Sequence, residues 1–96
     1  MIKTFKNSAT RRIYHGRKAG GLRGLDRALA VRRLDILDRI TSLDEVPPLK
    51  SFRLHPLKHG RSGQWAMTIN GPWRICFEWR EGDAYNVEIT DYHQGG

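Results

Sequence analysis

The chain has 96 residues, of which 39% are hydrophobic and 28% charged, with one cysteine and a formal net charge of +7 at pH 7. These values fit a single domain over residues 1–96 with a thin core. They exclude an internal disulfide and a multi-cysteine metal site, and no apolar run is long enough to span a membrane. We therefore expect a cytoplasmic protein without a membrane partner.

The positive charge is concentrated in the first two thirds of the chain. Residues 1–63 hold 15 Lys and Arg against 5 Asp and Glu, whereas residues 64–96 hold 2 against 5. No acidic residue precedes Asp26. A compact basic domain attracts polyanions, of which nucleic acid is the commonest. Excess basic residues also serve solubility alone, so the charge by itself leaves both interpretations open.

The first half of the sequence predicts a short strand and two helices. Residues 2–5 form the strand, and Ser8 caps a first helix that continues through Tyr14. A second helix is indicated by apolar side chains that fall within about 60° of one another on a helical wheel. Arg32 interrupts this stripe, and we expect its stem to pack and its charged head to reach solvent. The stripe consists of Leu22, Leu25, Leu29, Ile36, Ile40 and Leu43.

The second half predicts an antiparallel meander. Residues 51–57 form a short, polar-edged strand, and residues 65–70 and 73–79 alternate between apolar and smaller or polar side chains. The Asn70-Gly71 pair is a strong hairpin-turn signal between these two strands. The last strand alternates through Tyr85, Val87 and Ile89.

Two helices combined with a meander indicate an α+β fold of two layers, with the helices packed on one face of a mostly antiparallel sheet. The other face is then partly open, which is where a site fits. Because side chains alternate along a strand, Arg74 should point away from Trp73 and Ile75 and toward that open face. Cys76 is expected to be a small buried hydrophobe.

Side chains able to transfer protons lie in two clusters far apart in the sequence, and a meander is expected to bring them together with Arg74. Two histidines, a tyrosine and a carboxylate can pass protons, and nearby cations can stabilise a pentavalent phosphorane. RNA carries its own nucleophile in the 2′-OH, so we assign no metal ligand and no cofactor. Ordinary surface histidines are the alternative interpretation. The clusters are His55 with Arg53, Lys58 and Arg61, and Asp91 with Tyr92 and His93.

The second half also carries a series of short motifs in a fixed order. They are Leu54–Gly60, Gly63–Trp65, Trp73–Phe77, Gly82–Tyr85 and Asp91–His93. In this order they resemble the HigB-type toxins, the killer-protein branch of the RelE/ParE superfamily, closely over residues 49–93 and loosely over the helical half. One departure is His59, which interrupts the usual Lys-Gly step after Lys58 and predicts a longer loop with a displaced lysine.

The resemblance implies a RelE-like fold and a bacterial type II toxin that enters the ribosomal A site of the 30S subunit and cuts mRNA there. It also implies a HigA-like antitoxin with a helix-turn-helix domain, through which alone operator DNA would be bound. The cut should leave a 2′,3′-cyclic phosphate and a 5′-OH. By position, the family's catalytic group corresponds to His55, Asp91, Tyr92 and His93. Lys58 and Arg74 correspond to phosphate or transition-state contacts, and we add Arg53 and Arg61 as further RNA-binding cations.

Two alternatives remain open at the level of sequence. The basic stretch Gly16–Gly24 is expected to be a mobile loop that the antitoxin orders, with direct contact to ribosomal RNA as the alternative. The second function hypothesis is a ParE-like toxin that acts on DNA gyrase, or a module that binds only its antitoxin. Three titratable residues in one C-terminal run argue against a binder without chemistry.

Overall fold

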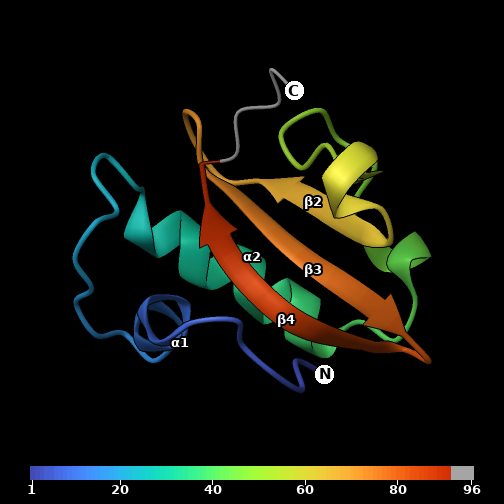
Figure 1. The fold of residues 1–96 in the computed structure, drawn as a ribbon, viewed down its shortest axis with the longest axis horizontal. Helices are drawn as coiled ribbons and strands as arrows, with labels where there is room; N and C mark the ends of the chain where they lie inside the picture. The colour runs from blue at the N-terminus through green and yellow to red at the C-terminus, as the bar shows by residue number, and fades with distance from the viewer. Residues whose placement is uncertain (92–96) are drawn as a thin grey trace.

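A four-stranded antiparallel sheet, with strand order β1-β2-β3-β4, carries both helices on one side (Figure 1). The computed structural model describes residues 1–91. The predicted α+β class, with helices on one face of the sheet, is confirmed. The strands are β1 (His55–Pro56), β2 (Gln64–Thr68), β3 (Arg74–Arg80) and β4 (Asp83–Thr90); the helices are α1 (Ser8–Tyr14), α2 (Arg27–Arg39) and the short 3₁₀ turns η1 (Leu43–Glu45) and η2 (His59–Arg61).

The strand predicted over residues 2–5 is present only as two isolated parallel bridges. Ile2 pairs with Ala84 and Phe5 pairs with Val87, so the N-terminal segment runs along the outer edge of β4. This segment is the parallel part of an otherwise antiparallel arrangement. It covers the edge that β4 would otherwise expose.

Both helices begin at a capping side chain. Asn7, not Ser8, caps α1, because its side chain accepts a hydrogen bond from the Thr10 backbone N–H at 2.9 Å. The Asp26 carboxylate accepts one from the Leu29 N–H at 3.0 Å and so starts α2 at the next residue. The second helix is therefore shorter than predicted, and four members of the predicted stripe lie outside it: Leu22, Leu25, Ile40 and Leu43.

The face that α2 turns toward the sheet also differs from the predicted stripe. Ala30, Leu34 and Leu37 are fully buried at the i, i+4 and i+7 spacing of a core-facing helix. This phase places Arg33 on the buried side with a 6% exposed fraction, whereas Arg32 is exposed. The expectation of an arginine stem packing at Arg32 is wrong, because it applies to the neighbouring residue.

The predicted alternation in β2 and β3 is confirmed. Met67, Ile75 and Phe77 are buried in one cluster with the helices, while Ala66 and Cys76 are buried on the opposite face with Leu57. The backbone turn after β2 also forms as predicted, since the Trp73 N–H donates to the Asn70 carbonyl at 2.8 Å.

The alternation in β4 is interrupted by a bulge. Asn86 has a φ of +52°, and the register between β3 and β4 shifts between Cys76 and Glu78. As a result Ala84 and Val87 are both fully buried, and Tyr85 pairs with Glu78 on the opposite face. The prediction that Tyr85 shares a face with Val87 is wrong, because the extra residue reverses the parity.

The strand predicted over residues 51–57 is reduced to the two residues of β1. Residues 49–53 instead form a turn, in which the Leu49 carbonyl accepts from the Phe52 and Arg53 N–H groups at 3.0 and 3.1 Å. Arg53 has a φ of +42°, which an extended strand does not tolerate.

The glycine-rich loop between α1 and α2 is tied to the turn that joins β2 and β3. The Trp73 indole N–H donates to the Arg23 carbonyl at 2.8 Å, and the Asn70 side chain donates to the Gly24 carbonyl at 2.9 Å. The mobility of this loop stays a prediction. Neither helix in residues 1–91 has the length and apolar character that a membrane crossing requires.

Shortening Leu34 tests the packing of α2 on the sheet. Because this side chain has no exposed surface, Leu34→Ala should lower the free energy of unfolding by about 2 to 5 kcal/mol. Leu49 is 58% exposed and is the matched control, with Leu49→Ala expected to change stability by less than about 0.5 kcal/mol. Urea denaturation measures the free energy of unfolding of both variants. An equal decrease in the two would show that Leu34 does not pack α2 against the sheet.

Candidate functional site

The face of the sheet turned away from both helices, called here the open face, carries the candidate site. In a paired sheet, side chains directly opposite one another point to the same face. Arg74 pairs with Thr68 and Thr90 at the end of the sheet where β4 finishes. The prediction that Arg74 points away from the helical layer is therefore confirmed. The neighbouring row across all four strands is His55, Ala66, Cys76 and Glu88.

His55 is half-buried on the open face in β1, and its orientation is set by the turn before it. Its Nδ1 lies 2.8 Å from the Arg53 carbonyl oxygen. A carbonyl oxygen only accepts, so Nδ1 carries a proton and the neutral ring holds its lone pair on Nε2. This tautomer suits the ring to accept a proton at Nε2.

Arg33 supports the same turn from the core side. Its guanidinium lies 3.6 Å from the centroid of the Phe52 ring and donates to the Ser51 carbonyl at 3.0 Å and the Thr68 carbonyl at 3.4 Å. Burial, together with the charge of Arg32, lowers the pKa of Arg33. The buried cation thus joins α2 and β2 to the turn that orients His55.

Arg61 reaches the open face from η2 and meets a carboxylate there. Its Nη1 donates to the Gln64 side chain at 3.1 Å and lies 3.6 Å from Glu88 Oε1. Lys6 Nζ lies 3.7 Å from the same oxygen. Arg61, predicted as a phosphate contact, is therefore paired with a carboxylate on the open face.

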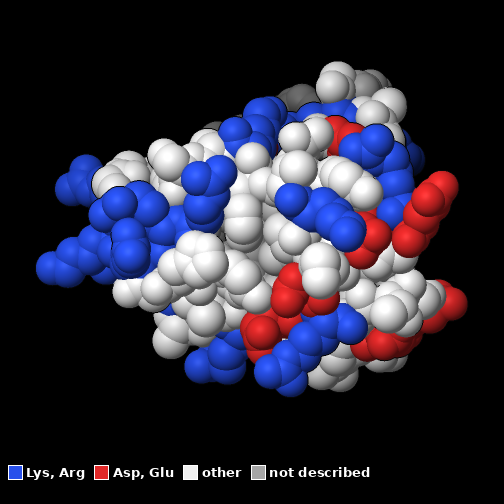
Figure 2. All heavy atoms as spheres, turned by 90° about the horizontal axis from the view of Figure 1, so that it is seen from below, with Lys and Arg blue, Asp and Glu red and all other residues white. Residues whose placement is uncertain are grey.

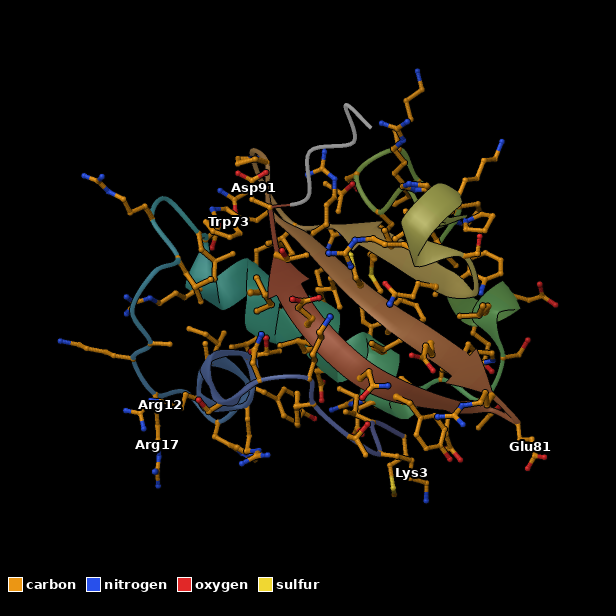
Figure 3. All side chains as sticks on the ribbon, viewed as in Figure 1. Lys3, Arg12, Arg17, Trp73, Glu81 and Asp91 are labelled. Carbon is orange, nitrogen blue, oxygen red and sulfur yellow. The ribbon has the colours of Figure 1, made fainter. Side chains whose placement is uncertain are left out.

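Arg74 and Asp91 lie at the same end of the sheet. Arg74 Nη1 donates to the Gly71 and Trp73 carbonyls at 2.8 and 3.0 Å. Figure 3 shows Asp91 beside Trp73 at the end of β4. The Oδ1 atom of Asp91 is buried, so this carboxylate is partly withdrawn from solvent.

The structure gathers some of the predicted site residues and separates others. His55, Arg61 and Arg74 share the open face, whereas Arg53 and Lys58 are exposed on the segments that flank β1. His55 and Asp91 belong to opposite edges of the four-stranded sheet, three strand spacings or roughly 14 Å apart across the backbone. The expectation that the meander brings the two clusters together is therefore wrong for this described pair. The predicted catalytic residues Tyr92 and His93 lie outside the described residues.

Three residues of this region were missed by sequence reasoning: Lys6, Arg33 and Glu88. Glu88 had a detectable signal, since it alternates with the apolar Val87 and Ile89. Among residues 1–91, no group of three His, Cys, Asp or Glu side chains is placed to hold a metal ion.

Cys76 forms the floor of the open face and is 1% exposed. Burial raises the pKa of its thiol to about 11. The prediction of a small buried hydrophobe is confirmed.

The raised pKa of Cys76 predicts that its thiol reacts slowly with a disulfide reagent. At pH 8 the thiolate fraction should be about 100-fold lower than for a group at the ordinary value of 9.0, because the shift spans two pH units. Since the thiol is neutral below its pKa, this protection is complete under pH 9 and is lost as pH rises through 11. The rate of reaction with a disulfide reagent at pH 8 measures this protection. A rate as high as that of the urea-unfolded chain would contradict the burial of Cys76.

Exchanging Arg33 for lysine tests the buried cation. A lysine keeps the charge but cannot both stack on Phe52 and bridge two carbonyls. Arg33→Lys should therefore lower the free energy of unfolding by about 2 kcal/mol. The adjacent Arg32→Lys is the matched control and should stay within about 0.5 kcal/mol of the parent chain. Equal stability of the two variants would show that the contacts of Arg33 with Phe52 and the two carbonyls do not stabilise the fold.

Comparison with known proteins agrees with the resemblance in the second half and extends it through the helical half. Residues 3–93 match the family described as the RelE-like toxin of the type II toxin-antitoxin system HigB. The Endoribonuclease HigB of Proteus vulgaris is 34% identical over 93 residues, which cover 97% of this chain and 100% of the relative. Membership of a type II system implies an antitoxin as a partner. The chain belongs to the HigB-like family of type II toxins.

Proposed function

We propose that this toxin is a ribosome-dependent endoribonuclease that cuts mRNA in the A site of the 30S subunit. The observation that carries the proposal is His55, held on an open face among cations in the tautomer that leaves its lone pair on Nε2. The relative's name, Endoribonuclease HigB, supports the same activity.

The chemistry requires one base, one acid and charge stabilisation. The ribose 2′-oxygen attacks the adjacent phosphorus as its proton passes to a base, and the bond from phosphorus to the 5′-oxygen breaks as an acid protonates that oxygen. The products are a 2′,3′-cyclic phosphate and a 5′-OH. His55 and His93 take the two proton-transfer roles, with Asp91 orienting or transferring a proton and Tyr92 stacking on a base or transferring a proton. Neither a metal ion nor a cofactor has a role in this proposal.

The cations divide between the reacting phosphate and its neighbours. Arg61 and Arg74 lie on the open face, and we assign them the stabilisation of the negative charge that develops on the phosphorane. Lys58 and Arg53 are exposed beside β1 and contact flanking phosphates of the RNA. Arg61 must exchange the Glu88 carboxylate for a phosphate oxygen when RNA binds.

The antitoxin partner is proposed to be HigA-like, with a helix-turn-helix domain that contacts operator DNA. The toxin then reaches DNA only through that complex. Its own direct partners are the ribosome and the mRNA.

Single-turnover cleavage of a translated mRNA tests the site. His55→Ala and Asp91→Asn should each slow cleavage by at least about 100-fold, because each removes a group that moves or orients a proton. Asp44→Asn is the matched control, since Asp44 is exposed in η1 outside the site, and it should cleave at the parent rate. Circular dichroism and antitoxin binding check that each variant is folded.

Unchanged cleavage in both site variants would remove His55 and Asp91 from the chemistry. A parent chain that stalls DNA gyrase in a supercoiling assay while translation continues would instead establish the ParE-like alternative. Both assays use the same purified toxin, so the two functions are separated directly.

A further inference from the structure

Basic side chains gather at the end of the molecule formed by α1 and the loop after it, as Figure 2 shows. Three hollows of about 570, 480 and 330 Å³ lie there and share lining residues, so together they make up one surface. We call this surface the basic hollow. Its cations are Arg11, Arg12, Arg17, Lys18 and Arg27, and all five are exposed.

The basic hollow is shaped by hydrogen bonds between α1 and the loop. Gly16, with a φ of +76°, reverses the chain after α1, and the Arg17 N–H returns to the Arg12 carbonyl at 2.8 Å. The Arg12 Nε donates to the Lys18 carbonyl at 2.7 Å, which fixes the arginine across the turn. The cations are thus presented by a folded segment.

The charges of the basic hollow are not balanced within the described chain. None of the five cations forms an ion pair with a carboxylate in residues 1–91, and no acidic side chain lines the three hollows. Helix electrostatics account for Arg11 and Arg12, which lie in the last turn of α1. They do not account for Arg27, which opens α2 where the helix dipole disfavours a cation.

The composition of the basic hollow favours nucleic acid over a protein as its ligand. Protein interfaces are anchored by buried aromatic and large apolar side chains. The large hydrophobic residues exposed in residues 1–91 are Met1 and Leu49, and neither lines the hollow. A group of five exposed cations that form no ion pair within residues 1–91 instead matches a backbone that carries a phosphate at every nucleotide.

We propose that the basic hollow is a binding site for the phosphate backbone of structured RNA, separate from the open face and deepening the proposed function by naming ribosomal RNA as the partner it contacts. Figure 3 shows Arg12 and Arg17 at the lower left of the molecule and Asp91 at its upper left, at the end of β4. The open face then binds the mRNA to be cut, and the basic hollow binds the ribosome.

The test compares two double variants that lose the same charge. Arg11→Ala/Arg17→Ala removes two cations of the basic hollow without removing the Arg12–Lys18 hydrogen bond. Lys3→Ala/Arg32→Ala removes two exposed cations elsewhere. Binding to purified 70S ribosomes and to a double-stranded RNA hairpin is measured over about 50 to 200 mM salt, the range in which phosphate contacts weaken steeply.

The hollow variant should bind both probes at least about tenfold more weakly, and its plot of log affinity against log salt should be shallower by roughly 1.5. The control variant should bind as the parent does, and both should bind the cognate antitoxin with parent affinity. Ribosome and hairpin binding equal to the control would overturn the inference. Loss of antitoxin binding with ribosome binding retained would also overturn it, and would make the hollow a protein-docking surface.

Failure of the proposed function is distinguished by cleavage. If the parent chain binds the hairpin through the hollow but cuts no mRNA, the inference stands and the endoribonuclease proposal falls. If the parent cuts mRNA and the hollow variant binds both probes normally, the reverse holds.

Discussion

The structure depends on one constraint, the strict alternation of side chains along β3. Ile75 and Phe77 are buried against the helices, and each such burial contributes about 1.5 to 3 kcal/mol. The residues between them, Arg74 and Cys76, are thereby directed to the open face. A register slip of one residue would bury the guanidinium and expose the phenyl ring, so core packing and site geometry are fixed together.

The same coupling extends to the turn before β1. Arg33 lies in the core layer, yet one of its hydrogen bonds ends on the Ser51 carbonyl and its guanidinium lies over the Phe52 ring. Arg53 follows in a left-handed conformation and supplies the carbonyl that orients His55. A buried charge thus connects the stability of the fold to the placement of a proposed catalytic group.

Sequence predicted the features that follow from local periodicity and turn chemistry. The alternation of β2 and β3, the turn at Asn70-Gly71 and the outward direction of Arg74 all depend on neighbouring residues alone. The start of α2 was misplaced because Leu22 and Leu25 continue the apolar stripe on the wheel, whereas the N-cap at Asp26 starts the helix only after them.

Features set by long-range contacts could not be predicted in this way. Asn86 lies in a bulge because the register between β4 and β3 shifts at this point, and its neighbours in the sequence do not predict a positive φ. Arg33 and Arg32 are indistinguishable by type, and only the tertiary phase of α2 decides which is buried. The ion pairs of Glu88 join residues 27 and 82 positions away in the chain, beyond any local pattern.

The central claim is that an open, cationic sheet face uses imidazole chemistry to cut RNA held by the ribosome. The most direct measurement maps the ends of a defined transcript incubated with the toxin, in the presence and absence of translating ribosomes. The account predicts fragments with 2′,3′-cyclic phosphate and 5′-OH ends at in-frame positions, formed only when ribosomes translate the message. Equal cutting of naked RNA, or fragments that end in a 3′-OH and a 5′-phosphate, would contradict it.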